Sequence, residues 1–389
     1  MNTYPAWSCY PGGLEPSRRR FLQVLATTAG ASVLACQSKV SGQEAAIATE
    51  EDIPGAYPED AVLLNFNENP LGPSPKALSA IREHGLLDAN RYNNIFPLIG
   101  ILARHHEISE TNILLGCGST EFLHIAPWTY LREGHSLVLP DPSYGWSAGV
   151  AASMGAEVTR VPLLDDGSVD AARLRKAFDR NTRLVYIANP NNPTGAALTL
   201  DEINELVAGL PEGAILMVDE AYSQFLPRGE SSIDLVKKDA PIIVARTFSK
   251  AYGLAGLRLG YAISNEEVIK QLKTFWLWDL GINAAVNVAA PAALADRDHV
   301  SAYIRTVDEG LDVLRAGLKE LGLASLPHRA PFFMVDLGRE AKPVVQALER
   351  EKIYVRDGQA WKKPTYLRIS VGLASENQAF LEALRQVLA

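Results

Sequence analysis

The chain reads RTFSKAYGLAGLRLGY over residues 246–261. Lys250 stands there among small and hydroxylated residues, and Arg258 follows eight positions later with glycines in between. An apolar run at residues 215–218 precedes this stretch and predicts a short buried strand, which Asp219 and Tyr222 follow. A lysine nucleophile, a carboxylate at the end of a strand and a tyrosine three residues later together indicate a site for covalent chemistry.

Three further motifs lie outside this region. Residues 116–121 read Gly-Cys-Gly-Ser-Thr-Glu, residues 189–195 read Asn-Pro-Asn-Asn-Pro-Thr-Gly, and residues 366–372 read Tyr-Leu-Arg-Ile-Ser-Val-Gly. With these motifs, the chain from about Leu64 to its C-terminus resembles the fold type I aminotransferases of class I/II, most closely the histidinol-phosphate aminotransferase branch. The resemblance implies pyridoxal 5'-phosphate as cofactor. It also implies transfer of an amino group between an amino acid, or a histidinol-phosphate-like amine, and a 2-oxo acid.

Two other functions remain open on the residues alone. A decarboxylase or lyase of the same fold would break a different bond at the α-carbon, and the sequence does not report the orientation that decides this. A non-catalytic protein that only binds the cofactor would be expected to lack Lys250 or Asp219, and both are present.

The resemblance assigns the catalytic roles to Lys250, Asp219 and Tyr222. Lys250 would bond covalently to the cofactor aldehyde and then move a proton, and Asp219 would pair with the pyridine nitrogen. Tyr222 and Asn192 would hydrogen-bond to the ring hydroxyl oxygen. The alternatives are a solvated lysine, a helix N-cap for Asp219 and an ordinary turn residue for Asn192.

The cofactor phosphate is expected at the start of a helix that follows the Gly-Cys-Gly motif, because backbone amides there suit an anion. The resemblance places these residues near the phosphate: Ser119, Thr120, Thr247, Ser249 and Arg258. Tyr144 would stack on the pyridine ring. Tyr92 would reach the phosphate of a neighbouring subunit, which implies a homodimer, although this branch usually has proline where Asn93 stands.

Arg368 resembles the arginine that binds the substrate α-carboxylate, for which a planar bidentate group is suited. Arg356 resembles an arginine that helps to bind a substrate phosphate in the histidinol-phosphate branch, and a surface ion pair with Asp357 is the alternative. The aromatic segment at residues 275–278 would line the substrate pocket and favour an aromatic or bulky amino donor, and packing in the core or in a dimer interface is the alternative.

The resemblance and the alternation of short apolar runs with helical segments predict an α/β fold. A large domain, residues 93–292, would hold a mainly parallel sheet of the seven-stranded type between helices. A smaller α+β domain would combine residues 60–92, which include an N-terminal arm, with residues 293–389. Expected strands lie at residues 113–115, 136–139, 184–188, 214–218, 242–244, 332–336 and 366–371.

The N-terminal region predicts an exported protein. Ser-Arg-Arg-Arg-Phe-Leu-Gln at residues 17–23 precedes an apolar stretch that ends at Ala35, and it resembles a twin-arginine signal peptide over residues 1–35. Cleavage near Ala35 would give a soluble periplasmic protein, and lipid attachment at Cys36 would give an anchored one. Residues 36–59 are expected to form a flexible tether. The net charge of −8 argues against nucleic acid as a partner, and the residues suggest no metal site.

Overall fold

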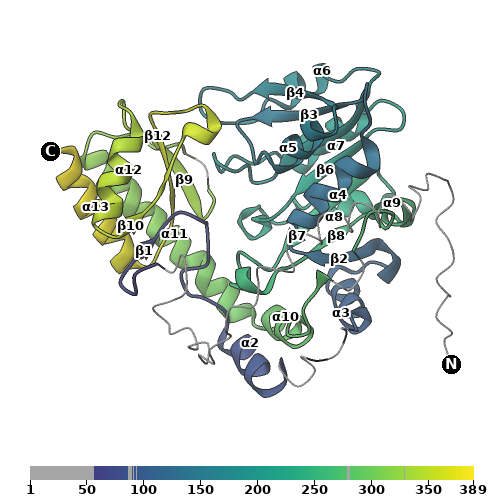
Figure 1. Ribbon diagram of the computed structural model, residues 1–389, viewed down its shortest axis with the longest axis horizontal. Helices are drawn as coiled ribbons and strands as arrows, with labels where there is room; N and C mark the ends of the chain where they lie inside the picture. The colour runs from purple at the N-terminus through teal and green to yellow at the C-terminus, as the bar shows by residue number, and fades with distance from the viewer. Residues whose placement is uncertain (1–56, 86–89, 91, 93, 278–280, 328) are drawn as a thin grey trace, which may run out of the picture. The chain divides into compact units, whose positions relative to one another are not determined.

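The computed structural model describes residues 57–389, except residues 86–89, 91, 93, 278–280 and 328 (Figure 1). The predicted signal peptide, Cys36 and most of the predicted tether therefore lie outside the described residues. No helix in the described part of the chain combines the length and apolar character that crossing a membrane requires.

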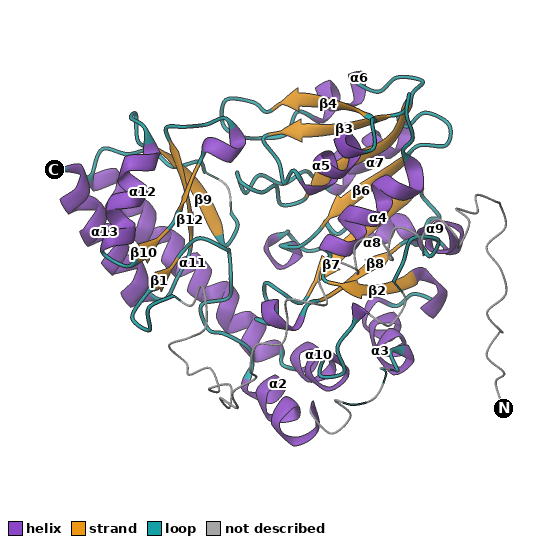
Figure 2. Ribbon diagram, viewed as in Figure 1, coloured by secondary structure: helices purple, strands orange, loops and turns teal. Residues whose placement is uncertain are grey.

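A seven-stranded sheet forms the centre of the larger part of the molecule (Figure 2). All neighbouring strands are parallel, except that β8 is antiparallel to both of its neighbours. This confirms the predicted sheet. In spatial order the strands are β2 (Ile113–Cys117), β8 (Leu259–Ile263), β7 (Ile242–Thr247), β6 (Ile215–Asp219), β5 (Thr182–Ala188), β3 (Ser136–Asp141) and β4 (Glu157–Pro162).

Helices cover both faces of this sheet, which explains why β5 and β6 are apolar and buried along almost their whole length. Alternate strand residues enter two separate hydrophobic cores. One core is completed by α2 (Pro75–Ala80), α3 (Phe96–His106), α6 (Ala171–Lys176), α7 (Leu200–Ala208), α8 (Ile233–Val236) and α10 (Val286–Ala295). The other is completed by α4 (Thr120–Tyr130), α5 (Trp146–Ser153) and α9 (Glu266–Leu272).

A smaller region combines the first described strand with the C-terminal third of the chain. β1 (Val62–Leu63) pairs in parallel with β10 (Ile353–Tyr354), and an antiparallel sheet has the order β11 (Arg356–Asp357), β12 (Tyr366–Ser370), β9 (Phe332–Asp336). Helices α11 (Arg297–Glu320), α12 (Ala341–Arg350) and α13 (Ala374–Leu388) complete its core. The predicted domain boundaries themselves stay a prediction.

Some strand limits differ from those expected. β6 begins at Ile215 rather than Ala214 and includes Asp219, so this carboxylate ends the strand instead of following it. β4 and β8 are not apparent from the apolar runs. β4 is an edge strand in which only Val161 is buried, and β8 begins inside the glycine-rich stretch that carries the site motif.

Candidate active site

The carboxyl ends of the parallel strands surround a cavity of about 340 Å³. Ligands in open α/β sheets bind at this edge because the loops after parallel strands meet there. Every predicted site residue except Tyr92 lines the cavity, namely Ser119, Thr120, Tyr144, Asn192, Asp219, Tyr222, Thr247, Ser249, Lys250, Arg258, Arg356 and Arg368. The fold therefore brings together side chains that are up to about 250 residues apart in the sequence.

Lys250 lies three residues beyond the end of β7. Its amine Nζ donates a hydrogen bond of 2.7 Å to the backbone oxygen of Phe66. Burial, with a smaller contribution from the Arg368 guanidinium, lowers the pKa of Lys250 to about 8. A substantial fraction of this amine is therefore neutral near physiological pH, which a nucleophile or a general base requires.

Asp219 is buried at the end of β6. The hydroxyl of Tyr186 donates a hydrogen bond of 3.3 Å to Oδ2, and the backbone N–H of Ala221 donates one of 3.2 Å to Oδ1. Burial raises the pKa of Asp219 to about 6 despite these donors. A cationic group bound in the cavity would stabilise the ionised form of this carboxylate.

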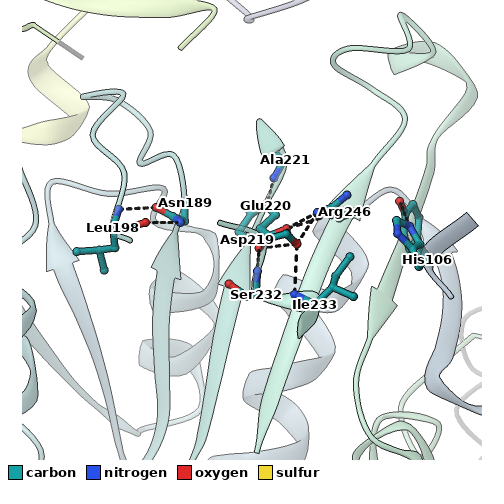
Figure 3. Close-up of polar contacts among 11 residues, drawn as sticks. His106, Asn189, Leu198, Asp219, Glu220, Ala221, Ser232, Ile233 and Arg246 are labelled. Carbon is teal, nitrogen blue, oxygen red and sulfur yellow. Dashed lines mark hydrogen bonds and ion pairs between the residues drawn. The ribbon is translucent and has the colours of Figure 1, made fainter. Parts of the chain in front are cut away.

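A buried ion pair lies beside Asp219 (Figure 3). Arg246 donates two hydrogen bonds to Oε2 of Glu220, of 2.6 Å from Nη2 and 3.1 Å from Nε. The backbone N–H of Ser232 donates one of 2.6 Å to Oε1. Because Glu220 directly follows Asp219, the last residue of β6, and Arg246 lies on β7, the strand that leads to Lys250, the pair joins the two strand ends that carry the site. Removal of one member would leave a buried charge unpaired, which is strongly destabilising.

The loop that carries Asn192 is held by paired hydrogen bonds. Asn189 accepts from the backbone N–H of Leu198 at 2.8 Å and donates to its backbone oxygen at 3.1 Å (Figure 3). Ser143 donates to the amide oxygen of Asn191 at 2.7 Å. These contacts explain why the Asn-Pro motif needs several asparagines, since two of them shape the loop and Asn192 lines the cavity.

An anion cradle lies at the start of α4. Within the described residues, the Ser119 side chain makes no capping hydrogen bond to this helix, so its hydroxyl is available, whereas the backbone N–H groups of Glu121 and Phe122 already donate to the backbone oxygens of Gly118 and Ser119. Arg258 donates to Ser249 at 3.2 Å, and Thr247 donates to the same hydroxyl at 2.9 Å. A Cβ atom on Gly118 would lie 2.3 Å from Nη2 of Arg258. Only glycine lets the arginine approach this loop, and the donor set fits a phosphate group.

Arg368 is buried and faces the cavity from β12. Nη1 donates a hydrogen bond of 2.9 Å to Asn192, and Nη2 donates to the backbone oxygen of Asn65. The guanidinium lies 5.6 Å from the ring centroid of Phe332 and 5.3 Å from that of Trp361. Its Nε has no hydrogen-bond partner among the described residues. A planar guanidinium that faces the cavity suits an incoming carboxylate.

Arg356 lies near an aromatic ring instead of forming the ion pair that was the alternative for this residue. Its guanidinium is 5.4 Å from the ring centroid of Phe66, and both side chains line the cavity. In the described part of the chain, no ion pair joins Arg356 to Asp357, whose Oδ1 instead accepts from the backbone N–H of Gln359 at 3.0 Å. The Arg356 charge is therefore available to an anionic ligand.

The aromatic segment does not line this cavity in its described residues. Trp276 donates a hydrogen bond of 2.8 Å to the backbone oxygen of Leu115 and packs against both cores of the large sheet. Phe275 and Leu277 instead border a second, mainly apolar pocket of about 590 Å³ with Trp128. This second pocket shares Thr120 and Arg258 with the first. Trp278 lies outside the described residues.

Some residues at the site had no predicted role. Phe66, Asn67 and Glu68 line the cavity, and Tyr186 hydrogen-bonds to Asp219. Residues 67–75 read Asn-Glu-Asn-Pro-Leu-Gly-Pro-Ser-Pro and resemble an N-terminal motif of the histidinol-phosphate aminotransferase branch, but such a motif does not say which side chains face a site. Tyr186 stands inside an apolar strand, where a tyrosine usually indicates core packing.

The chain matches known proteins over most of its length. The family model described as "Aminotransferase class I and II" matches residues 59–384. Histidinol-phosphate aminotransferase 2 of Pseudomonas fluorescens is 39% identical, over 85% of this chain and 90% of that protein. Histidinol-phosphate aminotransferase of Moorella thermoacetica is 34% identical, over 85% and 86% of the two chains.

A solved structure agrees with these sequence matches. Histidinol-phosphate aminotransferase from Sinorhizobium meliloti, crystallised in complex with pyridoxal-5'-phosphate, is similar with a TM-score of 0.78 and 31% identity. The alignment covers 84% of this chain and 90% of that one. The sheet, the cavity and these matches together identify the chain as a member of the class I and II aminotransferase family and as a pyridoxal phosphate-dependent aminotransferase.

Proposed function

We propose that this aminotransferase takes amino donors that carry an α-carboxylate and accepts a second anionic group on the donor. The observation that supports this most strongly is the position of two cationic side chains on one cavity wall. Arg368 has a buried Nε without a partner among the described residues, and Arg356 has no acidic partner there. The relatives are named for histidinol phosphate, whose phosphate is its only anionic group, so with such a donor the two arginines would face that phosphate and no carboxylate.

The residues would act as follows. When bound, pyridoxal phosphate supplies an aldehyde that takes the amino group and a ring that accepts electron density. Arg368 binds the donor carboxylate, and the amine Nζ of Lys250 takes the proton from the donor Cα and later returns it. Asp219 provides negative charge for the ring nitrogen, and Tyr222 and Asn192 provide hydrogen bonds for the ring oxygen. Tyr144 provides an aromatic surface beside them.

The phosphate would be held by the anion cradle, which joins the start of α4 to the loops around β7 and β8. Its hydroxyl groups, backbone amides and one guanidinium are donors that suit a phosphate. The residues are Ser119, Thr120, Thr247, Ser249 and Arg258.

A screen of amino donors tests this proposal. Purified holoenzyme is mixed with one donor at a time, and conversion of the bound cofactor to its amine form is followed by absorbance. Glutamate, aspartate and amino phosphates should react faster than alanine or leucine. A preference for apolar donors would contradict the role of Arg356, and release of carbon dioxide without transfer would contradict transamination of that donor.

We propose that the active unit is a homodimer in which Tyr92 completes the partner's site. Tyr92 is 89% exposed and does not line its own cavity. The second pocket adds exposed Trp128, Trp146 and Phe275 beside Arg258, and a partner chain would cover this apolar surface.

Mixing inactive variants tests the shared site. Lys250→Ala and Tyr92→Ala subunits, mixed and allowed to exchange, should recover activity that neither variant has alone. Recovery is expected because, in a mixed dimer, the Tyr92→Ala subunit keeps its own Lys250 and receives Tyr92 from the Lys250→Ala subunit. If the mixture stays inactive although mixed dimers form, Tyr92 does not act across the interface.

We propose that the protein is exported through the twin-arginine route. The support is Arg18 and Arg19 before the apolar stretch that ends at Ala35. Cell fractionation should find the mature protein outside the cytoplasm and without residues 1–35. Intact protein in the cytoplasm would contradict export. Release from membranes by Cys36→Ser would indicate a lipid anchor, and no change would indicate simple cleavage.

A further inference from the structure

Asn67 occupies an unusual position between the two parts of the molecule. It is buried, lines the cavity and has a left-handed backbone with φ of 55°. Asparagine tolerates this conformation better than most residues other than glycine. Its side chain contacts Ser370 on β12 and Tyr222 after β6, so it connects the strand of the substrate arginine with a residue on the cofactor side.

The direction of these hydrogen bonds follows from one fixed donor. The backbone N–H of Asn67 can only donate, and it lies 2.9 Å from Oγ of Ser370, which therefore accepts. The Ser370 hydroxyl lies 2.8 Å from Oδ1 of Asn67 and gives its single proton to that oxygen. The amide nitrogen of Asn67 then faces Tyr222 and donates to its hydroxyl oxygen at 3.0 Å.

Tyr222 is consequently an acceptor toward Asn67, and its own phenolic proton stays available. No described residue accepts that proton, and Tyr222 lines the cavity. A phenol that accepts one hydrogen bond also becomes a better donor, because linked hydrogen bonds polarise each other. The network therefore sets which way this hydroxyl donates.

We infer that Asn67 is a positioning residue that fixes Tyr222 as a hydrogen-bond donor toward the ring oxygen of the cofactor. This inference rests on the role proposed above for Tyr222. It extends that role because it names the group that sets the direction of the Tyr222 hydroxyl. It also explains why a buried asparagine with a left-handed backbone lies at this point of the segment.

The direct test is Asn67→Asp, which keeps the size and the backbone preference but replaces the donating amide with an acceptor. Tyr222 would then donate to the new carboxylate and no longer to the cofactor. A hydrogen bond donated to the ring oxygen stabilises the negatively charged form of that oxygen, and this form predominates after the lysine-bound cofactor has lost its proton. Loss of the donor should therefore raise the pH midpoint of the colour change that accompanies this deprotonation. We expect a rise of about one pH unit.

The new carboxylate also adds charge, and a double-mutant cycle with Tyr222→Phe separates the two effects. The charge acts in both backgrounds, whereas the reversed hydrogen bond acts only where the hydroxyl is present. The rise caused by Asn67→Asp should therefore be clearly larger in the wild-type background. Asn67→Gly, which suits the left-handed backbone, should give a smaller rise because it frees the hydroxyl without reversing it.

Asn377→Asp is a matched control, because Asn377 is equally buried but bonds to the backbone of Gly372. It should lower thermal stability without moving the midpoint. If Asn67→Asp moves the midpoint equally in both backgrounds, only the inference on Asn67 is overturned. If Tyr222→Phe alone leaves the midpoint unchanged, the proposed role of Tyr222 fails, and the inference fails with it.

Discussion

Nη1 of Arg368 donates a hydrogen bond of 2.9 Å to the amide oxygen of Asn192, and both side chains are buried. Arg368 lies on β12 of the smaller region, and Asn192 lies in the loop after β5 of the large sheet. The contact therefore joins the arginine proposed for the substrate carboxylate to the side of the cavity proposed for the cofactor. With these proposed roles, substrate binding and cofactor binding would share this pair.

Replacing Arg368 should affect all α-amino acid donors alike, because each carries the carboxylate that it binds. Truncation of a buried charged partner costs about 2–5 kcal/mol. For Arg368→Ala we expect kcat/KM to fall by a similar, large factor for glutamate, aspartate and alanine. Arg368→Lys keeps the positive charge but not the planar pair of donors, so its kcat/KM should fall less than that of Arg368→Ala. A loss confined to one donor would exclude the carboxylate role.

Replacing Arg356 should instead be selective. Arg356→Ala should reduce kcat/KM for anionic donors by a factor that corresponds to about 2 kcal/mol or more. For apolar donors the factor should correspond to less than about 1 kcal/mol. Phe66→Leu removes the ring near the guanidinium and should cost about 0.5–1 kcal/mol for the anionic donors alone. Equal, small losses for both classes would remove Arg356 from the substrate site.

The lowered pKa of Lys250 predicts how the cofactor-free protein captures pyridoxal phosphate. The neutral amine reacts, and its fraction increases as pH rises through the pKa of about 8. The attachment rate should therefore rise with a midpoint near pH 8, and stopped-flow absorbance measures it. Arg368→Ala removes a nearby positive charge and should move the midpoint upward. Lys250→Ala should form no bond that borohydride reduction can trap, whereas a trapped peptide without Lys250 would refute the assignment.

Asp219 should reduce the stability of the cofactor-free protein. Its pKa is about 6 in the folded protein against an ordinary value of 3.8 for aspartate, so the folded state binds the proton more tightly. Stability is then lost as pH rises from about 4 to 6, and the cost above that window is about 2–3 kcal/mol. Asp219→Asn should stabilise the cofactor-free protein at pH 7, with little effect near pH 4, while weakening cofactor binding. Equal unfolding free energies of the two proteins at pH 7 would contradict this.

Gly118 tests the anion cradle. A Cβ atom there would displace Arg258, and φ of 76° is unfavourable for alanine. Gly118→Ala should weaken cofactor binding by at least about tenfold, on the order of 1.4 kcal/mol. Gly134→Ala is the control because its φ of 83° gives similar strain but no atom lies within 4 Å of the added Cβ. If both variants lose the cofactor equally, backbone strain and not Arg258 explains the loss.

Several elements were predictable because their signals are local. The apolar runs of β5 and β6 predict buried strands, as expected for a sheet that helices cover on both faces. Thr199 and Glu202 form a capping box that marks the start of α7. The side chains proposed for cofactor chemistry stand in contiguous motifs after such strands. Strand-end position then suffices to predict that they converge.

The sequence by itself therefore determined the α/β architecture, the family and most of the residues around the cavity. Only the tertiary structure decided their partners, because these contacts join distant segments. Asn67 contacts Ser370 and Tyr222 across separations of 303 and 155 residues, and Phe66 meets Lys250 across 184. Arg356 lies near Phe66, and not against its sequence neighbour Asp357, for the same reason. A sequence motif fixes which side chains are present, whereas burial and packing fix the direction in which each one donates.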